Sequence, residues 1–205
     1  MPEANSSLQV SSFIDSAKSV SKVQEYDPAA FSQIPLIKDA IPVYFMSGLS
    51  KVVESIGALL RDSQLESLFG VCLLHRHFDI GSDEKLVEYN GSATPWVNGS
   101  EVSAGGSVTA QSWFFYNDKL LPFEYEYLPV GTEPTVDWEM VPTRFLTDLK
   151  VLLDSHDSGH LLGLRKYPGD DYPGGVEITQ GSTNIVFRPD HVCTLITRLL
   201  GSWIR

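Results

Sequence analysis

One pair of strands constrains the fold of this chain more than any other feature. Between residues 107 and 128 the sequence alternates, and the alternation is interrupted once, at Asn117-Asp118. In the second half Phe123, Tyr125 and Tyr127 fall on one face of a strand, while Glu124 and Glu126 fall on the other. Two such runs around a short polar turn predict a β-hairpin of residues 107–116 and 120–128.

The rest of the chain divides into further strands and three amphipathic helices. Residues 68–80 are apolar on both faces, which is typical of a central strand rather than an edge strand. A helix is predicted over residues 39–61, with Pro42 in its first turn and with Gly48 lowering its propensity without breaking it. The other expected strands and helices cover residues 85–90, 142–154 (helix), 161–167, 176–179, 185–187 and 190–203 (helix).

These elements predict an α+β fold. Because every connection between strands is short or a hairpin, we expect a mostly antiparallel sheet of about seven strands with two to three helices packed on it. Residues 1–35 read as a polar N-terminal extension with short helices, one of which starts at Asp27-Pro28, and residues 36–205 as a single domain. Residues 91–106 are rich in Gly and Ser and predict a long loop that holds a short strand.

Composition excludes several classes of protein. The chain carries 26 acidic and 15 basic residues, a formal charge of −11, which argues against binding of nucleic acid. Its longest charge-free apolar stretch, Ala40 to Ser50, is too short for the roughly 20 residues of a membrane span. Cys72 and Cys193 lie in apolar surroundings and no secretory signal is visible, so a reducing compartment, the cytoplasm, is expected.

The residues that most invite a chemical role are His75-Arg76-His77, at the end of the strand 68–80. Residues two apart on a strand share a face, so both imidazoles point the same way. They could transfer protons without a metal, or supply two ligands of a metal site. Candidates for a third metal ligand come from other elements: Glu88, Glu124, Glu126 and His160.

Aromatic side chains form the second candidate feature. Nine of the chain's 22 aromatic residues lie between residues 96 and 138, and on facing strands they could line an apolar cavity or the core beneath a helix. Arg76 and Arg165 are flanked by apolar residues and must each be paired, with a carboxylate of the protein or with an acidic ligand. The candidate substrate-binding residues are Arg76, Trp96, Trp113, Phe115, Phe123, Tyr127 and Arg165.

Three hypotheses about function follow. The first is an enzyme without metal or organic cofactor that isomerises, eliminates from or cyclises an apolar small molecule, with His75, His77 and Tyr125 as catalytic residues. The second is a metalloenzyme with His75 and His77 as ligands. The third is a non-catalytic protein that binds a partner through its acidic middle third, since residues 67–140 hold 11 acidic and 3 basic residues. No sequence motif of a known mechanism is present, and the oligomeric state stays open.

Overall fold

The structure is a computed structural model that describes residues 23–100, 105–134, 136–172 and 174–187. Its helices are α1 (Pro28–Phe31), α2 (Ile37–Met46), α3 (Ser50–Asp62) and α5 (Thr143–Ser155), with a 3₁₀ turn η1 (Trp138–Met140). Asp27 caps α1 by accepting hydrogen bonds from the backbone of Ala29 and Ala30, which confirms the helix start expected at Asp27-Pro28. The predicted helix 190–203 lies outside the described residues.

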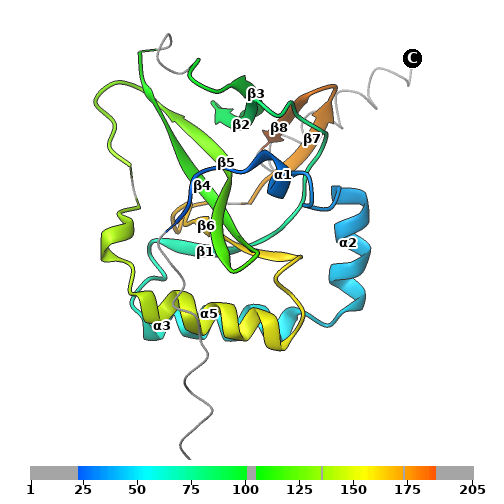
Figure 1. The fold of residues 1–205 in the computed structure, drawn as a ribbon, viewed down its shortest axis with the longest axis vertical. Coiled ribbons are helices and arrows are strands. Elements are labelled where there is room, and N and C mark those ends of the chain that lie inside the picture. Colours follow the sequence, from blue (N-terminus) through cyan, green and yellow to red (C-terminus); the bar gives the residue numbers. More distant parts are fainter. Residues whose placement is uncertain (1–22, 101–104, 135, 173, 188–205) are drawn as a thin grey trace, which may run out of the picture.

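Eight strands form one curled sheet, which confirms the α+β fold and adds one strand to the expected number (Figure 1). The strands lie in the order β1-β6-β4-β5-β2-β3-β8-β7, and the pairing of β2 with β5 is parallel while the others are antiparallel. The eight strands are β1 (Phe69–Leu73), β2 (Glu84–Tyr89), β3 (Ser92–Val97), β4 (Ser107–Tyr116), β5 (Lys119–Leu128), β6 (Leu162–Lys166), β7 (Val176–Gln180) and β8 (Thr183–Phe187).

The hairpin expected from the alternation is present as β4 and β5. Asn117 and Asp118 at its turn both have positive φ, +47° and +62°, the combination that matches the twist of the flanking strands. A register shift around Ser112 bends β4. The hairpin pairs with β6 on one side and with β2 on the other, so it occupies the centre of the sheet.

The prediction of a single helix over residues 39–61 is wrong. Two helices, α2 and α3, meet there at an angle of 92°. The cause is Gly48, whose φ of +63° is left-handed and ends the first helix, since glycine adopts this conformation without a steric cost. The regular helix also begins earlier than expected, at Ile37, so that Pro42 lies inside α2 rather than in its first turn.

The central position predicted for the strand at 68–80 is also wrong. The strand is β1, and among the strands that the structure describes it lies at one edge of the sheet, paired only with β6. It is apolar on both sides for another reason: Phe69 packs in the cluster beneath α3 and α5, whereas Leu74 packs in a second cluster around α1. Full burial, expected from Val71 through Leu74, holds only for Leu74.

Two apolar clusters hold the hairpin from opposite faces. The larger joins Trp113 and Leu120 to α3 and α5, which lie side by side across one end of the sheet (Figure 1). The smaller joins Phe114 and Phe123 to α1. Among the described residues no single helix is long and apolar enough to cross a membrane, although the bent pair α2–α3 reaches that length and composition when its two helices are counted together.

Two glycines on neighbouring strands provide a test of this packing. A methyl group at Gly163 in β6 would lie 2.6 Å from Leu74 Cδ2 and 2.6 Å from the Trp113 carbonyl oxygen, whereas one at Gly70 in β1 would meet nothing within 4 Å. Gly163→Ala should therefore lower the free energy of unfolding by about 1–3 kcal/mol. The matched Gly70→Ala variant should be neutral or more stable. Urea unfolding of both variants checks this, and equal effects would contradict the close approach at Gly163.

Candidate functional site

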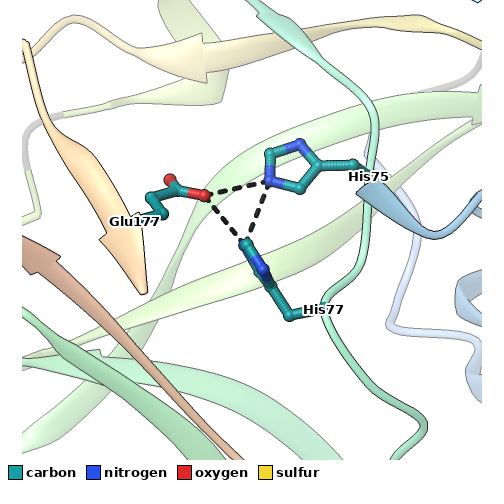
Figure 2. A group of neighbouring side chains, drawn as sticks. All are labelled: His75, His77 and Glu177. Carbon is teal, nitrogen blue, oxygen red and sulfur yellow. Dashed lines mark hydrogen bonds and ion pairs between the residues drawn. The ribbon is translucent and has the colours of Figure 1, made fainter. Parts of the chain in front are cut away.

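The two histidines lie where the chain leaves β1, and they face β7 at the other end of the strand order (Figure 2). The three atoms that converge are His75 Nε2, His77 Nε2 and Glu177 Oε2. The two imidazole nitrogens are 3.2 Å apart, and the carboxylate oxygen lies 3.1 Å from His75 and 2.8 Å from His77. The curl of the sheet therefore brings together groups that are 100 and 102 residues apart in the sequence.

The outer nitrogen of each ring has a partner of its own. His75 Nδ1 lies 2.9 Å from the Leu73 carbonyl oxygen, which can only accept, so this nitrogen carries a proton. His77 Nδ1 lies 2.8 Å from the Thr179 hydroxyl, two residues beyond Glu177 on the same face of β7. When His75 is neutral, its Nε2 has a lone pair that points at the Glu177 carboxylate.

Burial and neighbouring charges shift the pKa values of His75 and Glu177 in this cluster. The side chains of His77, His75 and Glu177 are 4%, 17% and 25% exposed. Hydrogen bonds from the two histidines hold the pKa of Glu177 far below its usual range, against the opposing effect of burial. Burial alone would lower the pKa of His75, but the hydrogen bond to Glu177 and the charges of Glu177 and Glu124 raise it above the usual value.

A cavity of about 490 Å³ opens on Glu177 from inside the curled sheet, and we call it the polar cavity. Arg165 lies in its wall between two carboxylates, with guanidinium nitrogens 3.5 Å from Glu88 and 3.9 Å from Glu124. The full set of charged or amide side chains in the wall is Glu88, Gln111, Glu126, Arg165, Lys166 and Glu177.

Of the two arginines singled out from the sequence, Arg165 is the one whose charge is paired inside the polar cavity. Lys166 donates to Glu126 at 2.5 and 2.7 Å, and Gln111 donates to Glu88 at 3.0 Å. Arg76 is placed elsewhere: it donates to the Ile34 carbonyl oxygen at 2.7 Å and pairs with Asp79. Both arginines are thus partnered by the protein itself.

The aromatic residues expected near the histidines are distributed over other parts of the fold. Trp113 and Phe115 belong to the cluster beneath α3 and α5, and Phe123 to the cluster around α1. Trp96 stacks at a tilt on Tyr127, with 5.6 Å between ring centroids. None of these residues lines the polar cavity.

Tyr125, expected as a catalytic residue, contacts Tyr26 edge to face at 5.9 Å, and the Lys85 ammonium lies 5.2 Å from the centroid of its ring. Its neighbours Glu124 and Glu126 face the polar cavity side of β5. Because successive side chains of a strand point to opposite faces, Tyr125 projects away from that side.

Sequence reasoning missed Glu177. The expected third ligands were Glu88, Glu124, Glu126 and His160, of which Glu88 and Glu126 line the polar cavity and His160 is exposed outside it. A signal was present, since Glu177 and Thr179 alternate on a predicted strand. Their position beside the histidines was hidden, because β1 and β7 are not neighbours in the sheet and meet only through its curl.

Comparison with known proteins adds no further constraint: no protein-family model, curated protein or solved structure matches this chain. Its function must therefore be argued from its own geometry.

The coupling of Glu177 to the histidines predicts how stability depends on pH in the metal-free protein. The lowered pKa of Glu177 gives stability that is present above about pH 4.5 and lost as the pH falls. The raised pKa of His75 gives stability that is present below about pH 6.5 and lost as the pH rises through its folded-state pKa. The difference in unfolding free energy between the native protein and Glu177→Gln should therefore peak between these two values.

Urea unfolding in a chelator at pH 4, 5.5 and 8 measures that difference. An equal difference at all three values would contradict the coupling.

Proposed function

We propose that His75, His77 and Glu177 bind a divalent transition-metal ion, and that the protein uses it to act on a polar small molecule in the polar cavity. The observation that carries this proposal is the convergence of three ligand atoms, two of them on imidazole rings whose outer nitrogens already have partners. Metal-binding histidines characteristically donate their second ring N–H to a carbonyl or another acceptor, as His75 does to Leu73. Two imidazoles with one carboxylate are a donor set suited to zinc or iron(II).

The spacing of the three atoms suits an ion of this size. They lie 2.8–3.2 Å from one another. Ligands at about 2.0–2.1 Å from a tetrahedral zinc ion are about 3.3 Å apart. Binding would therefore need only a slight outward movement of each side chain. A three-ligand site of this kind would leave open positions on the ion for water or substrate.

The charge around the cluster also favours a cation. Three carboxylates and two cationic side chains line the polar cavity among the described residues, and Glu124 adds a further carboxylate beside Arg165. Without an ion, and with the histidines neutral, the negative charge of these carboxylates would exceed the positive charge of Arg165 and Lys166. A divalent cation would bring the enclosure close to neutrality and polarise a substrate oxygen as a Lewis acid.

A second function is favoured by the pairing of His75 with Glu177, whose facing atoms lie 3.1 Å apart in a hydrogen bond that raises the pKa of His75. A histidine that stays protonated toward neutral pH can act as a general acid, with Glu177 stabilising the imidazolium. This is the cofactor-independent enzyme considered from the sequence. Its substrate would enter the same cavity, which is lined by charged groups, so a polar substrate is favoured over an apolar one at this place.

Metal titration separates the two functions. In calorimetry of the chelator-treated protein, zinc should bind with a stoichiometry of one, and His75→Ala or Glu177→Gln should weaken binding by more than about 100-fold, since each removes a ligand itself. His156→Ala is the matched control, because His156 is exposed at the end of α5 and outside the cluster. If zinc bound equally well to all variants, or not at all to the native protein, the metal site would be rejected and the acid–base function favoured.

Thr179→Val tests the support of the ligand His77. The substitution keeps the shape of the side chain but removes the hydroxyl that contacts His77 Nδ1. We expect zinc affinity to fall by about 10- to 100-fold with the stoichiometry unchanged. Thr147→Val, which removes a hydroxyl bound within α5, is the control and should leave the affinity as it is. An unchanged affinity in Thr179→Val would show that this contact does not orient the ring.

A further inference from the structure

One helix, α2, exposes an apolar face. Among its ten residues only Ala40 is fully buried, and the helix stands at the outside of the fold (Figure 1). Four large apolar side chains are exposed within six consecutive residues, and we call them the α2 face: Ile41 at 40%, Val43 at 38%, Phe45 at 78% and Met46 at 79%. In the part of the chain that the structure describes, no other six consecutive residues expose more than two. Apolar surface gathered in this way is typical of a contact that covers it.

The charges next to the α2 face are few and of both signs. Lys38 and Asp39 lie in the first turn of α2, and the next charged residue along the chain is Lys51 in α3. Helices that lie on a membrane surface carry several Lys or Arg beside their apolar face. One Lys next to one Asp does not provide this, so the α2 face suits an apolar protein surface better than a lipid surface.

The sequence supplies an apolar surface of this kind beyond the last described strand. Apolar residues recur at helical spacing over residues 190–203, and all fall within one stripe of the predicted helix: Val192, Leu195, Ile196, Leu199 and Trp203. A helix of this length would be about 21 Å long, against about 15 Å for α2. A stripe of this width needs another element to cover it.

The end of β8 lies within reach of α2. Its last residue, Phe187, pairs with Val176, the neighbour of Glu177. Glu177 contacts the two histidines, and the backbone carbonyl of Arg76 between them accepts at 3.0 Å from the N–H of Ile37, the first residue of α2. The 18 residues that follow β8 span up to about 60 Å when extended. This length exceeds the path from β8 to α2 by a wide margin.

Net charge favours a partner in the same molecule over a second copy of the chain. Residues 188–205 hold three of the chain's 15 basic residues and one of its 26 acidic residues. This segment is therefore positive, whereas the rest of the chain is more negative than the formal charge of −11 of the whole. Opposite net charges attract within one molecule, and two copies of so acidic a chain repel each other.

We propose that residues 190–203 form a helix that packs its apolar stripe against the α2 face of the same molecule. This contact would connect the end of β8 to the helix that begins beside Arg76, and so would fasten one end of the strand order to the other. It does not rest on the metal proposed at His75, His77 and Glu177.

Hydrogen exchange of the full chain, read by mass spectrometry, tests this contact. The amides of residues 192–203 should exchange more slowly than those of an unfolded peptide. Phe45→Glu should speed their exchange by about 10- to 100-fold, because it places a charge in an apolar contact. Val130→Glu is the matched control, since Val130 is 82% exposed and lies outside α2, and it should leave the exchange unchanged. Unchanged exchange in β4 and β5 shows that both variants fold.

A pair of substitutions tests the contact from the other side. Leu199→Glu should speed exchange of residues 192–203 by a similar factor. When it is combined with Phe45→Glu, the exchange should be no faster than in either single variant, because each already breaks the same contact. Thr197→Glu lies on the opposite side of the predicted helix, and its effect should be small and should add to that of Phe45→Glu.

Four results would overturn the contact. The first two are fast exchange of residues 192–203 in the native protein and equal acceleration by Val130→Glu. A third is slow exchange that is lost on dilution, which would assign the α2 face to a second copy. The last is slow exchange in α2 that appears only with phosphatidylcholine vesicles, which would assign the face to a membrane.

Discussion

Three residue pairs between β2 and β5 hold the two halves of this protein together. The parallel register Leu86↔Glu124, Val87↔Tyr125 and Glu88↔Glu126 joins β1-β6-β4-β5 to β2-β3-β8-β7. Val87 at its centre is completely buried. On one side of this junction Glu88 and Glu126 line the polar cavity, whereas Tyr125 projects from the opposite face of β5. The wall of the polar cavity thus depends on one short parallel contact in an otherwise antiparallel sheet.

Local patterns predicted the local structure well. The hairpin β4–β5, the cap of α1 and the helix α5 follow from residues close together in the sequence, whose periodicity and turn residues are read directly. The break at Gly48 was missed because a glycine in an amphipathic run is compatible with either a weakened helix or a left-handed corner. Packing of α3 along α5 decides between them, and that contact is not local.

The candidate site, too, could be predicted from the sequence only in part. His75 and His77 could be singled out, because two residues on one strand share a face whatever the rest of the chain does. Glu177 could not, since nothing in the sequence places β7 against the end of β1. The sequence also showed that residues 67–140 are acidic, but not where their carboxylates lie. Those of Glu88, Glu124 and Glu126 are mostly buried, and they pair with Arg165 and Lys166. Their charge acts on an enclosed space more than on the surface.

Glu177 belongs to two structures at once, since it contacts both imidazoles and also stands in the wall of the polar cavity. If the polar cavity and the histidine cluster bind ligands as proposed, the two binding events are thermodynamically linked through this single side chain. A molecule that draws the Glu177 carboxylate toward the cavity would weaken the contact of Glu177 with the histidines. By reciprocity, that contact would lower the affinity of the cavity for the molecule by the same factor. The two ends of the sheet would then be held together more or less firmly according to what the cavity contains.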